Sequence, residues 1–243
     1  MDMVVVDVGI HHDMTGVPGL LDRKIAWGTK NIAEGPAMTR EQAIRSIEIG
    51  IEIAEENVRK GYKVFSIGEM GISNTTSSAC ILGTFNHWNA IEVTGRGTNI
   101  SDERLVHKVE VVQKAMDVNH PDPKDGLDVL AKVGGFEFGC LTGVILGAAA
   151  NHAMTIIDGF NTTASAFIAK ALAPQVTDYL MASHLSLEQA HKKSLAALGL
   201  SEYIDLDFRL GESIGAGIQK KMLDMAISVY RECVTKEEAG VEA

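Results

Sequence analysis

The chain has 243 residues, of which 46% are hydrophobic, enough for one large domain with a substantial core. Its net charge of −10 argues against nucleic acid, which needs a basic face. No run approaches the ~18–20 apolar residues of a membrane span, and the start, MDMVVVDVG, lacks the basic region of a secretory signal. Three scattered cysteines, Cys80, Cys140 and Cys233, fit buried thiols in a reducing cytoplasm better than disulfides or a zinc site.

The first half of the chain alternates strand-like and helix-like segments. Residues 4–8 form an apolar run typical of a strand, and a polar loop follows. A helix is then predicted from Thr39, which can form a capping box with Gln42, to Gly61, which stops it. Apolar spacing predicts three further elements: a strand over 62–67, a helix beginning over 74–85, and a helix over 102–117 that buries Leu105, Val109, Val112 and Met116.

The second half continues the same alternation. Residues 127–152, rich in Gly, Ala and Leu, predict one or two tightly packed helices. Further elements are expected as a strand over 155–157, a helix to 172, a strand over 179–182 and a helix over 214–230. Repeated strand-then-helix units predict an α/β fold: a parallel sheet with helices on both faces, in a Rossmann-like three-layer arrangement. We expect a single domain over residues 1–234 and a flexible tail over 235–243.

Two glycine-rich segments carry the chemistry: GEMGISNTT at 68–76 and RLGESIGAG at 209–217. Each places one carboxylate, Glu69 or Glu212, among glycines and small polar residues. Backbone N–H groups of such loops can cradle an anion. Because a carboxylate would repel that anion, the pattern predicts a substrate with a phosphate at one end and a proton-bearing basic group at the other. The first segment follows a predicted strand, where open α/β sheets bind ligands.

The chain resembles the nicotinate-nucleotide:5,6-dimethylbenzimidazole phosphoribosyltransferase family. The segments that carry the resemblance cover the chain in the family's order: VVDVGI, GTKNI, PAMT, GEMGISNTT, TGRGT, GGFE, DGF, SHLS and RLGESIGAG. Where the family reads GIGNTT this chain has Ser73, and where it reads GEGTGA this chain has Ser213 and Ile214. Members of the family are longer, and we expect this chain to lack their N-terminal segment, which closes one side of the aromatic-base pocket.

The resemblance implies transfer of phosphoribose from nicotinate mononucleotide to an aromatic base, without cofactor or metal. The family's general base matches Glu212, and Glu69 is expected to stabilise positive charge at ribose C1 or to position the base. The apolar neighbours Leu210 and Ile214 are expected to bury Glu212. A homodimer is implied as well, and the apolar surplus over 137–150 favours it.

The substrate phosphate is expected on N–H groups of residues 71–76 or 95–98, with Lys108 as the nearest basic side chain. Asp158 is expected to hold the ribose hydroxyls. The residues expected to bind substrate are Gly68, Gly71, Ser73, Asn74, Thr75, Gly95, Arg96, Gly97, Lys108, Asp158, Gly159, Phe160, Leu210 and Gly211.

Four of these residues also have a simpler interpretation. Glu212 could be a carboxylate at a helix N-terminus, worth roughly 0.3–1 kcal/mol. Asp158 and Gly159 could form only a turn, and Arg96 could be a surface charge. A metal set of His184, Glu188 and His191 has suggestive spacing and no third firm ligand, so we expect no metal.

Two functions of different class stay open at this stage. The first is an active phosphoribosyltransferase. The second is a non-catalytic nucleotide-binding or assembly subunit whose missing segment comes from a second polypeptide. A Rossmann oxidoreductase is a distant third, because no GxGxxG follows the first strand. The sequence leaves open which aromatic base is accepted and whether the chain acts alone.

Overall fold

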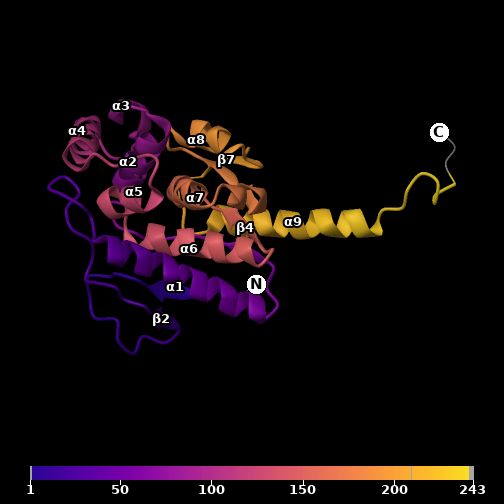
Figure 1. Cartoon of the computed structure of the whole chain (residues 1–243). Coiled ribbons are helices and arrows are strands. Elements are labelled where there is room, and N and C mark those ends of the chain that lie inside the picture. The colour runs from indigo at the N-terminus through magenta and orange to yellow at the C-terminus, as the bar shows by residue number, and fades with distance from the viewer. Residues whose placement is uncertain (1, 209, 241–243) are drawn as a thin grey trace.

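The computed structural model describes residues 2–208 and 210–240 (Figure 1). Arg209, which opens the second glycine-rich segment, and the last three residues of the predicted tail lie outside the described residues. The assignment of residues 1–234 to one domain stays a prediction. No helix within the described ranges has both the length and the apolar character to cross a membrane.

The strands of the described residues all pair in parallel. Strands β3 (Val64–Ser66), β4 (Met154–Ile157) and β5 (Leu180–Ala182) form one sheet in the order β3-β4-β5. Two parallel pairs accompany it: β1 (Val5–Asp7) with β2 (Leu20–Asp22), and β6 (His184–Ser186) with β7 (Ile204–Phe208). With the helices around them they confirm the predicted three-layer α/β fold.

Helix α1 (Arg40–Arg59) has both predicted ends. The Thr39 hydroxyl accepts the N–H of Gln42, and the Gln42 side chain accepts the N–H of Thr39 in return. At the other end Gly61 takes a φ of +97°, a left-handed conformation that glycine adopts without strain. The predicted helix is therefore confirmed from cap to cap.

Helix α6 (Phe136–Ala150) packs along α1, as Figure 1 shows. Glycines make this approach close: a Cβ at Gly50 would lie 1.9 Å from the Cys140 carbonyl oxygen, and one at Gly143 would lie 2.0 Å from the Ile47 oxygen. Helix α7 (Phe160–Leu172) also packs against α6. The apolar surplus of α6 therefore serves the core of this chain and not, as predicted, a contact between two copies.

Five further helical segments complete the described part of the body. They are α2 (Thr75–Asn86), α3 (Ala90–Val93), α4 (Asp102–Asn119), α5 (Gly126–Val133) and α8 (His191–Leu198), and a 3-10 turn (Pro174–Tyr179) precedes β5. Of the four residues predicted to be buried in α4, only Val112 is fully buried, because α4 lies at the surface of the fold. Strands β2, β6 and β7 and helices α3 and α8 fall in segments that the sequence did not predict.

The final helix, α9 (Ile214–Glu232), begins against the sheet and then extends away from the rest of the molecule (Figure 1). Its outer part carries exposed apolar side chains at spacings of three and four: Ile218, Met222, Met225 and Val229. Cys233, which follows the helix, is exposed, so the prediction of a buried thiol there is wrong, whereas Cys80 and Cys140 are buried.

Candidate active site

The two glycine-rich segments meet at the carboxyl end of β3. A Cβ at Gly68 would lie 2.3 Å from the backbone nitrogen of Ser213, so the two backbones touch at a point where only glycine fits. The Ser66 hydroxyl also donates to the Ala216 carbonyl oxygen at 3.3 Å, which ties β3 to the first turn of α9. Glu69 and Glu212, each next in sequence to one of the touching residues, therefore lie on adjoining loops.

The Glu69 carboxylate is held by three donors. Its Oε2 accepts the N–H of Gly71 at 2.7 Å and a short hydrogen bond from the Asn74 side-chain amide. Its Oε1 accepts from the Asn161 side-chain amide at 2.7 Å. Hydrogen bonds to an ionised carboxylate are among the stronger ones, so these donors fix the orientation of the Glu69 side chain. The Gly71 N–H, predicted to bind phosphate, is thereby already donated to a glutamate.

A wider network surrounds Glu69. Asn161 also donates to the Asn74 side-chain oxygen at 2.9 Å, and the Ser78 hydroxyl donates to the Asn161 oxygen at 2.6 Å. Asn74 donates in addition to Glu137 at 3.2 Å. Burial, aided by the negative charge of Glu69, raises the pKa of Glu137. The sequence did not single out Asn161 or Glu137; the only signal was their place in the DGFN and GGFE segments.

Three consecutive residues of the second loop have left-handed backbones. Gly211, Glu212 and Ser213 have φ values of +72°, +58° and +68°. Such conformations are strained for residues other than glycine and are often found at functional sites. Glu212 is exposed, and its neighbours Leu210 and Ile214 are 69% and 40% exposed. The predicted burial of Glu212 is therefore wrong for the described chain, since the loop turns these apolar side chains outward.

The Asp158 carboxylate holds this loop through hydrogen bonds to its backbone. Its Oδ1 accepts the N–H of Ala216 at 2.9 Å, and its Oδ2 accepts the N–H of Ser213 at 3.2 Å. The carboxylate thus occupies the N-terminus of α9, where the helix dipole favours negative charge. Burial nevertheless raises its pKa. Because both oxygens already bind backbone N–H groups, the geometry assigns Asp158 to holding the Glu212 loop rather than to the predicted contact with ribose.

The suggested metal set does not converge. His191 accepts the N–H of Ser186 on Nδ1, so its other nitrogen, Nε2, donates to the Thr163 hydroxyl at 3.0 Å. Burial lowers the pKa of His191 to about 3. Glu188 is directed elsewhere, to the N–H of Gly97. Across residues 2–208 and 210–240, no three His, Cys, Asp or Glu side chains are grouped as metal ligands.

Gly159 and Phe160 belong to the scaffold of the site. The Gly159 carbonyl oxygen accepts the Thr163 hydroxyl at 2.9 Å in the first turn of α7. Phe160 is 3% exposed and packs edge-on against His191. Gly159 therefore supports the start of α7, and Phe160 packs this turn against α8.

Lys108 joins the first glycine loop to the TGRGT segment. Its ammonium donates to the Thr75 hydroxyl at 2.8 Å and to the Gly95 carbonyl oxygen at 3.0 Å. Burial lowers the pKa of Lys108, and the charge of Glu188 opposes that shift. Arg96, in contrast, is exposed and pairs with Asp102, which agrees with its interpretation as a surface charge. The structure therefore brings Thr75, Gly95 and Lys108 together and directs Arg96 away.

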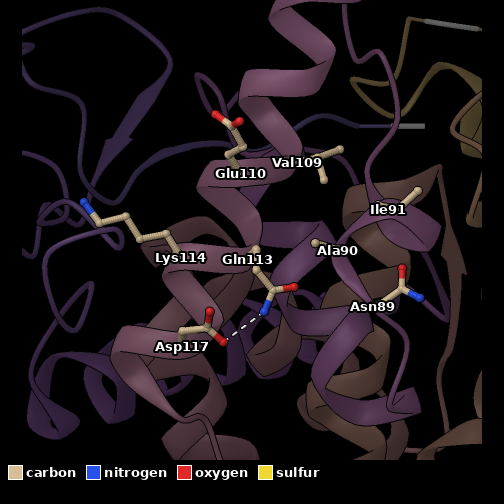
Figure 2. Close-up of a pocket in the computed structure, with 8 residues that line it drawn as sticks. All are labelled: Asn89, Ala90, Ile91, Val109, Glu110, Gln113, Lys114 and Asp117. Atoms are coloured by element: carbon tan, nitrogen blue, oxygen red, sulfur yellow. Dashed lines mark hydrogen bonds between the residues drawn. The ribbon is translucent and has the colours of Figure 1, made fainter.

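A separate groove lies between α3 and α4 (Figure 2). Gln113 and Asp117, hydrogen-bonded to each other at 2.9 Å, stand on its α4 side, and Asn89 and Ile91 stand on the other. None of the residues that line it is among those predicted to bind substrate. The groove is therefore distinct from the two-glutamate site.

Comparison with known proteins agrees with this geometry. A family model described as Phosphoribosyltransferase matches residues 1–241. A nicotinate-nucleotide–dimethylbenzimidazole phosphoribosyltransferase of Geobacter sulfurreducens is 47% identical over 237 residues, covering 98% of this chain and 67% of the relative. One of the same description from Clostridioides difficile is also 47% identical and is covered to 68%. This chain thus spans about two thirds of the length of these relatives.

Solved structures give the same result. The crystal structure of a protein of this description from Thermus thermophilus matches with a TM-score of 0.91 at 37% identity, covering 98% of this chain and 70% of the other. Another from the same organism, described as CobT, matches with a TM-score of 0.93 at 39% identity, covering 98% and 71%. Fold and site therefore define a phosphoribosyltransferase. The chain belongs to the nicotinate-nucleotide–dimethylbenzimidazole phosphoribosyltransferase family.

Proposed function

We propose that this protein transfers the phosphoribosyl group of nicotinate mononucleotide to 5,6-dimethylbenzimidazole or a related aromatic base. The products are nicotinate and an α-ribazole 5′-phosphate type of nucleotide, a building block for the lower ligand of cobamides. The observation that carries the proposal is the contact of Gly68 with Ser213, which sets the Glu69 and Glu212 loops side by side. No observation favours the alternative of a non-catalytic subunit.

The chemistry needs one general base. A ring nitrogen of the incoming base attacks ribose C1 from the face opposite nicotinate, and a new C–N bond forms as the old one breaks. The electron pair of the broken bond returns to the pyridinium nitrogen, so nicotinate leaves with a neutral ring and needs no proton. The N–H proton of the incoming base passes to the Glu212 carboxylate. Its exposed position leaves Glu212 accessible to an incoming base.

Glu69 has the complementary electrostatic role. As C1 detaches from nicotinate it gains positive charge, which a fixed carboxylate stabilises. The three donors on Glu69 hold it as a preorganised anion, since Asn74 and Asn161 cannot move without breaking their own hydrogen bonds. Glu69 then needs no reorientation during the reaction.

The phosphate end of the substrate lies, in this proposal, at Lys108. This ammonium bridges Thr75 at the start of α2 and Gly95 in the TGRGT segment. A helix N-terminus beside a partly buried ammonium is a favourable place for a phosphate. Because the N–H groups of Gly71 and Gly97 already bind carboxylates, Lys108 and the first turn of α2 are the main phosphate donors.

A coupled assay tests the proposal directly. Purified protein is supplied with nicotinate mononucleotide and 5,6-dimethylbenzimidazole, and nicotinate and the α-linked nucleotide are quantified together. Equal amounts of the two products support the transfer. Release of nicotinate without the α-linked product would point to hydrolysis instead, and binding of the nucleotide without release would contradict catalysis.

We further propose a homodimer and a cytoplasmic location. The exposed apolar side chains of Ile218, Met222, Met225 and Val229 follow the three-and-four spacing of a helix face that packs against another helix. This stripe replaces α6 as the basis for the dimer. The buried thiols of Cys80 and Cys140 are compatible with a reducing compartment.

A further inference from the structure

Glu188 lies in the turn between β6 and α8, and its carboxylate lies directly against the TGRGT segment. Its Oε1 accepts the N–H of Gly97 at 2.6 Å. A Cβ at Gly95 would lie only 1.8 Å from its Oε2, so any larger residue at position 95 would have to displace the Glu188 carboxylate. Glu188 and this glycine segment therefore fit each other closely, although they lie far apart in sequence.

The reaction described above does not explain why the second carboxylate oxygen of Glu188 is buried. Oε2 is buried, and among the described residues it has no hydrogen-bond partner. A buried carboxylate oxygen without donors is costly unless a positive charge lies close by. In the described part of the chain the nearest such charge is the Lys108 ammonium, which forms no direct ion pair with Glu188. Its Nζ and the Oε1 of Glu188 both lie near Gly97, at 3.5 and 3.9 Å from the point that a Cβ there would occupy.

We propose that Glu188 is a positioning residue for the phosphate end of the substrate. Its carboxylate holds the Gly95–Gly97 segment through the Gly97 N–H and supplies the counter-charge that keeps Lys108 a protonated, fixed donor. The inference rests on the proposed function, because it assumes that Lys108 binds the phosphate. It adds Glu188, from the turn between β6 and α8, to the residues proposed to serve the phosphate end of the substrate.

Several other charged or titratable groups near Lys108 pair with one another. Within α4 and the segment before it, Arg96 pairs with Asp102, and His107 lies 3.7 Å from Glu110. The groups that contact Lys108 from α2 and the TGRGT segment, the Thr75 hydroxyl and the Gly95 carbonyl, carry no charge. Glu188 is the charge that raises the pKa of Lys108 against the effect of burial.

The test measures how much the phosphate contributes to binding as the pH rises. Calorimetry gives the dissociation constants of nicotinate mononucleotide and of its phosphate-free riboside, and their ratio isolates the phosphate. Above pH ~7 the phosphate is already a dianion, so a change in this ratio reports on the protein. We expect a ratio of roughly 10–100 for the wild type, typical of charge-assisted hydrogen bonds.

Glu188→Gln keeps an acceptor for the Gly97 N–H but removes the charge. We expect the ratio to fall at a pH about one unit lower than in the wild type, because a nearby opposite charge stabilises an ammonium by about that much. Glu110→Gln, the same change at an exposed site on the helix that carries Lys108, is the matched control and should keep the wild-type curve. A purely structural role for Glu188 would leave the pH curve of Glu188→Gln unchanged and would overturn the proposal.

Gly95→Ala provides a second route should Glu188→Gln fail to fold. The added methyl group would displace the Glu188 carboxylate, so the ratio should again fall at lower pH. A wild-type curve in Gly95→Ala would overturn the proposal. A ratio near one at every pH in the wild type would instead show that the protein does not bind the phosphate at Lys108. That outcome contradicts the proposed phosphate site, whereas an unchanged pH curve in the variants contradicts only the role of Glu188.

Discussion

The side-chain amide of Asn161 donates to Oε1 of Glu69 at 2.7 Å, across 92 residues of sequence. The contact joins the first turn of α7 to the loop after β3, the two segments that follow neighbouring strands of the sheet. Together with Asn74 it fixes the orientation of the carboxylate that is proposed to stabilise charge at ribose C1. The role proposed for Glu69 therefore depends on a side chain from a distant segment.

Asn161→Asp should lower kcat/KM by roughly 10–100-fold, because it removes a hydrogen bond to a charged group and places a second carboxylate against Glu69. Steady-state kinetics with both substrates measures the effect. Asn151→Asp, at the end of α6, is the control and should retain wild-type kinetics. Unchanged kcat/KM in Asn161→Asp would show that the orientation of Glu69 is unimportant.

Ser73→Gly should stabilise the protein by about 0.5–1 kcal/mol. Ser73 has a φ of +64°, which is strained for serine and free of strain for glycine. Chemical denaturation gives the change in the free energy of unfolding. Ser77→Gly, inside α2, is the matched control and should destabilise by roughly 0.5–1 kcal/mol, because glycine weakens a helix interior. Destabilisation by both changes would contradict the assigned backbone of Ser73.

Two serines stand where the family has glycine, and the structure explains why the family has glycine there. Ser73 and Ser213 both have left-handed backbones, with φ values of +64° and +68°. The family's glycines at these positions are therefore explained by the backbone itself, and the two serines carry a local strain in the site loops.

Much of the fold could be predicted because its signals are local. The capping box at Thr39 and the stop at Gly61 define α1 within a few residues of each end. Strand β6 lacked such a signal, because it has only three residues. Strand β7 does alternate apolar and acidic residues (IDLDF), which is a local strand signal that the prediction missed.

The sequence predicted the two glutamates of the site but not the residues that hold the site in place. Glu69 and Glu212 stand out among glycines in the sequence. Asn161, Glu137 and Glu188 act through partners that lie 63 to 92 residues away in sequence, so no local pattern marks these supporting contacts. The spacing of Glu188 to His191 suggested only a metal set. Asp158 was predicted to contact ribose, but the structure has it holding the first turn of α9.

The buried imidazole of His191 should make stability depend on pH. Burial lowers its pKa from 6.5 to about 3, so between these values the unfolded chain binds a proton that the folded protein does not. The contribution of His191 to the free energy of unfolding is therefore fully present above pH 6.5. As the pH falls toward 3 the free energy of unfolding decreases by about 1.4 kcal/mol per pH unit. Denaturation at several pH values should show a shallower slope in His191→Gln; an identical slope would contradict the assignment.

The apolar stripe of α9 predicts the surface through which two copies associate. Met225, 61% exposed, lies in the middle of the stripe, and Met225→Glu should convert a dimer into a monomer in sedimentation at micromolar concentration. Ile227→Glu, an apolar-to-charged change on the opposite side of the same helix, is the matched control and should stay dimeric. A monomeric wild type would contradict the proposed homodimer, and a dimer that survives Met225→Glu would move the contact elsewhere.

The central claim is that Glu212 accepts the proton of the incoming base, and Glu212→Gln tests it most directly. Glutamine keeps the size and hydrogen bonding of the side chain but cannot accept the proton. Turnover of nicotinate mononucleotide with 5,6-dimethylbenzimidazole should fall by roughly 10²–10⁴-fold while the affinity for the nucleotide barely changes. Glu41→Gln, which removes a carboxylate from the first turn of α1, should keep full turnover. Wild-type turnover in Glu212→Gln would contradict the account and leave Glu212 as a charge near a helix end.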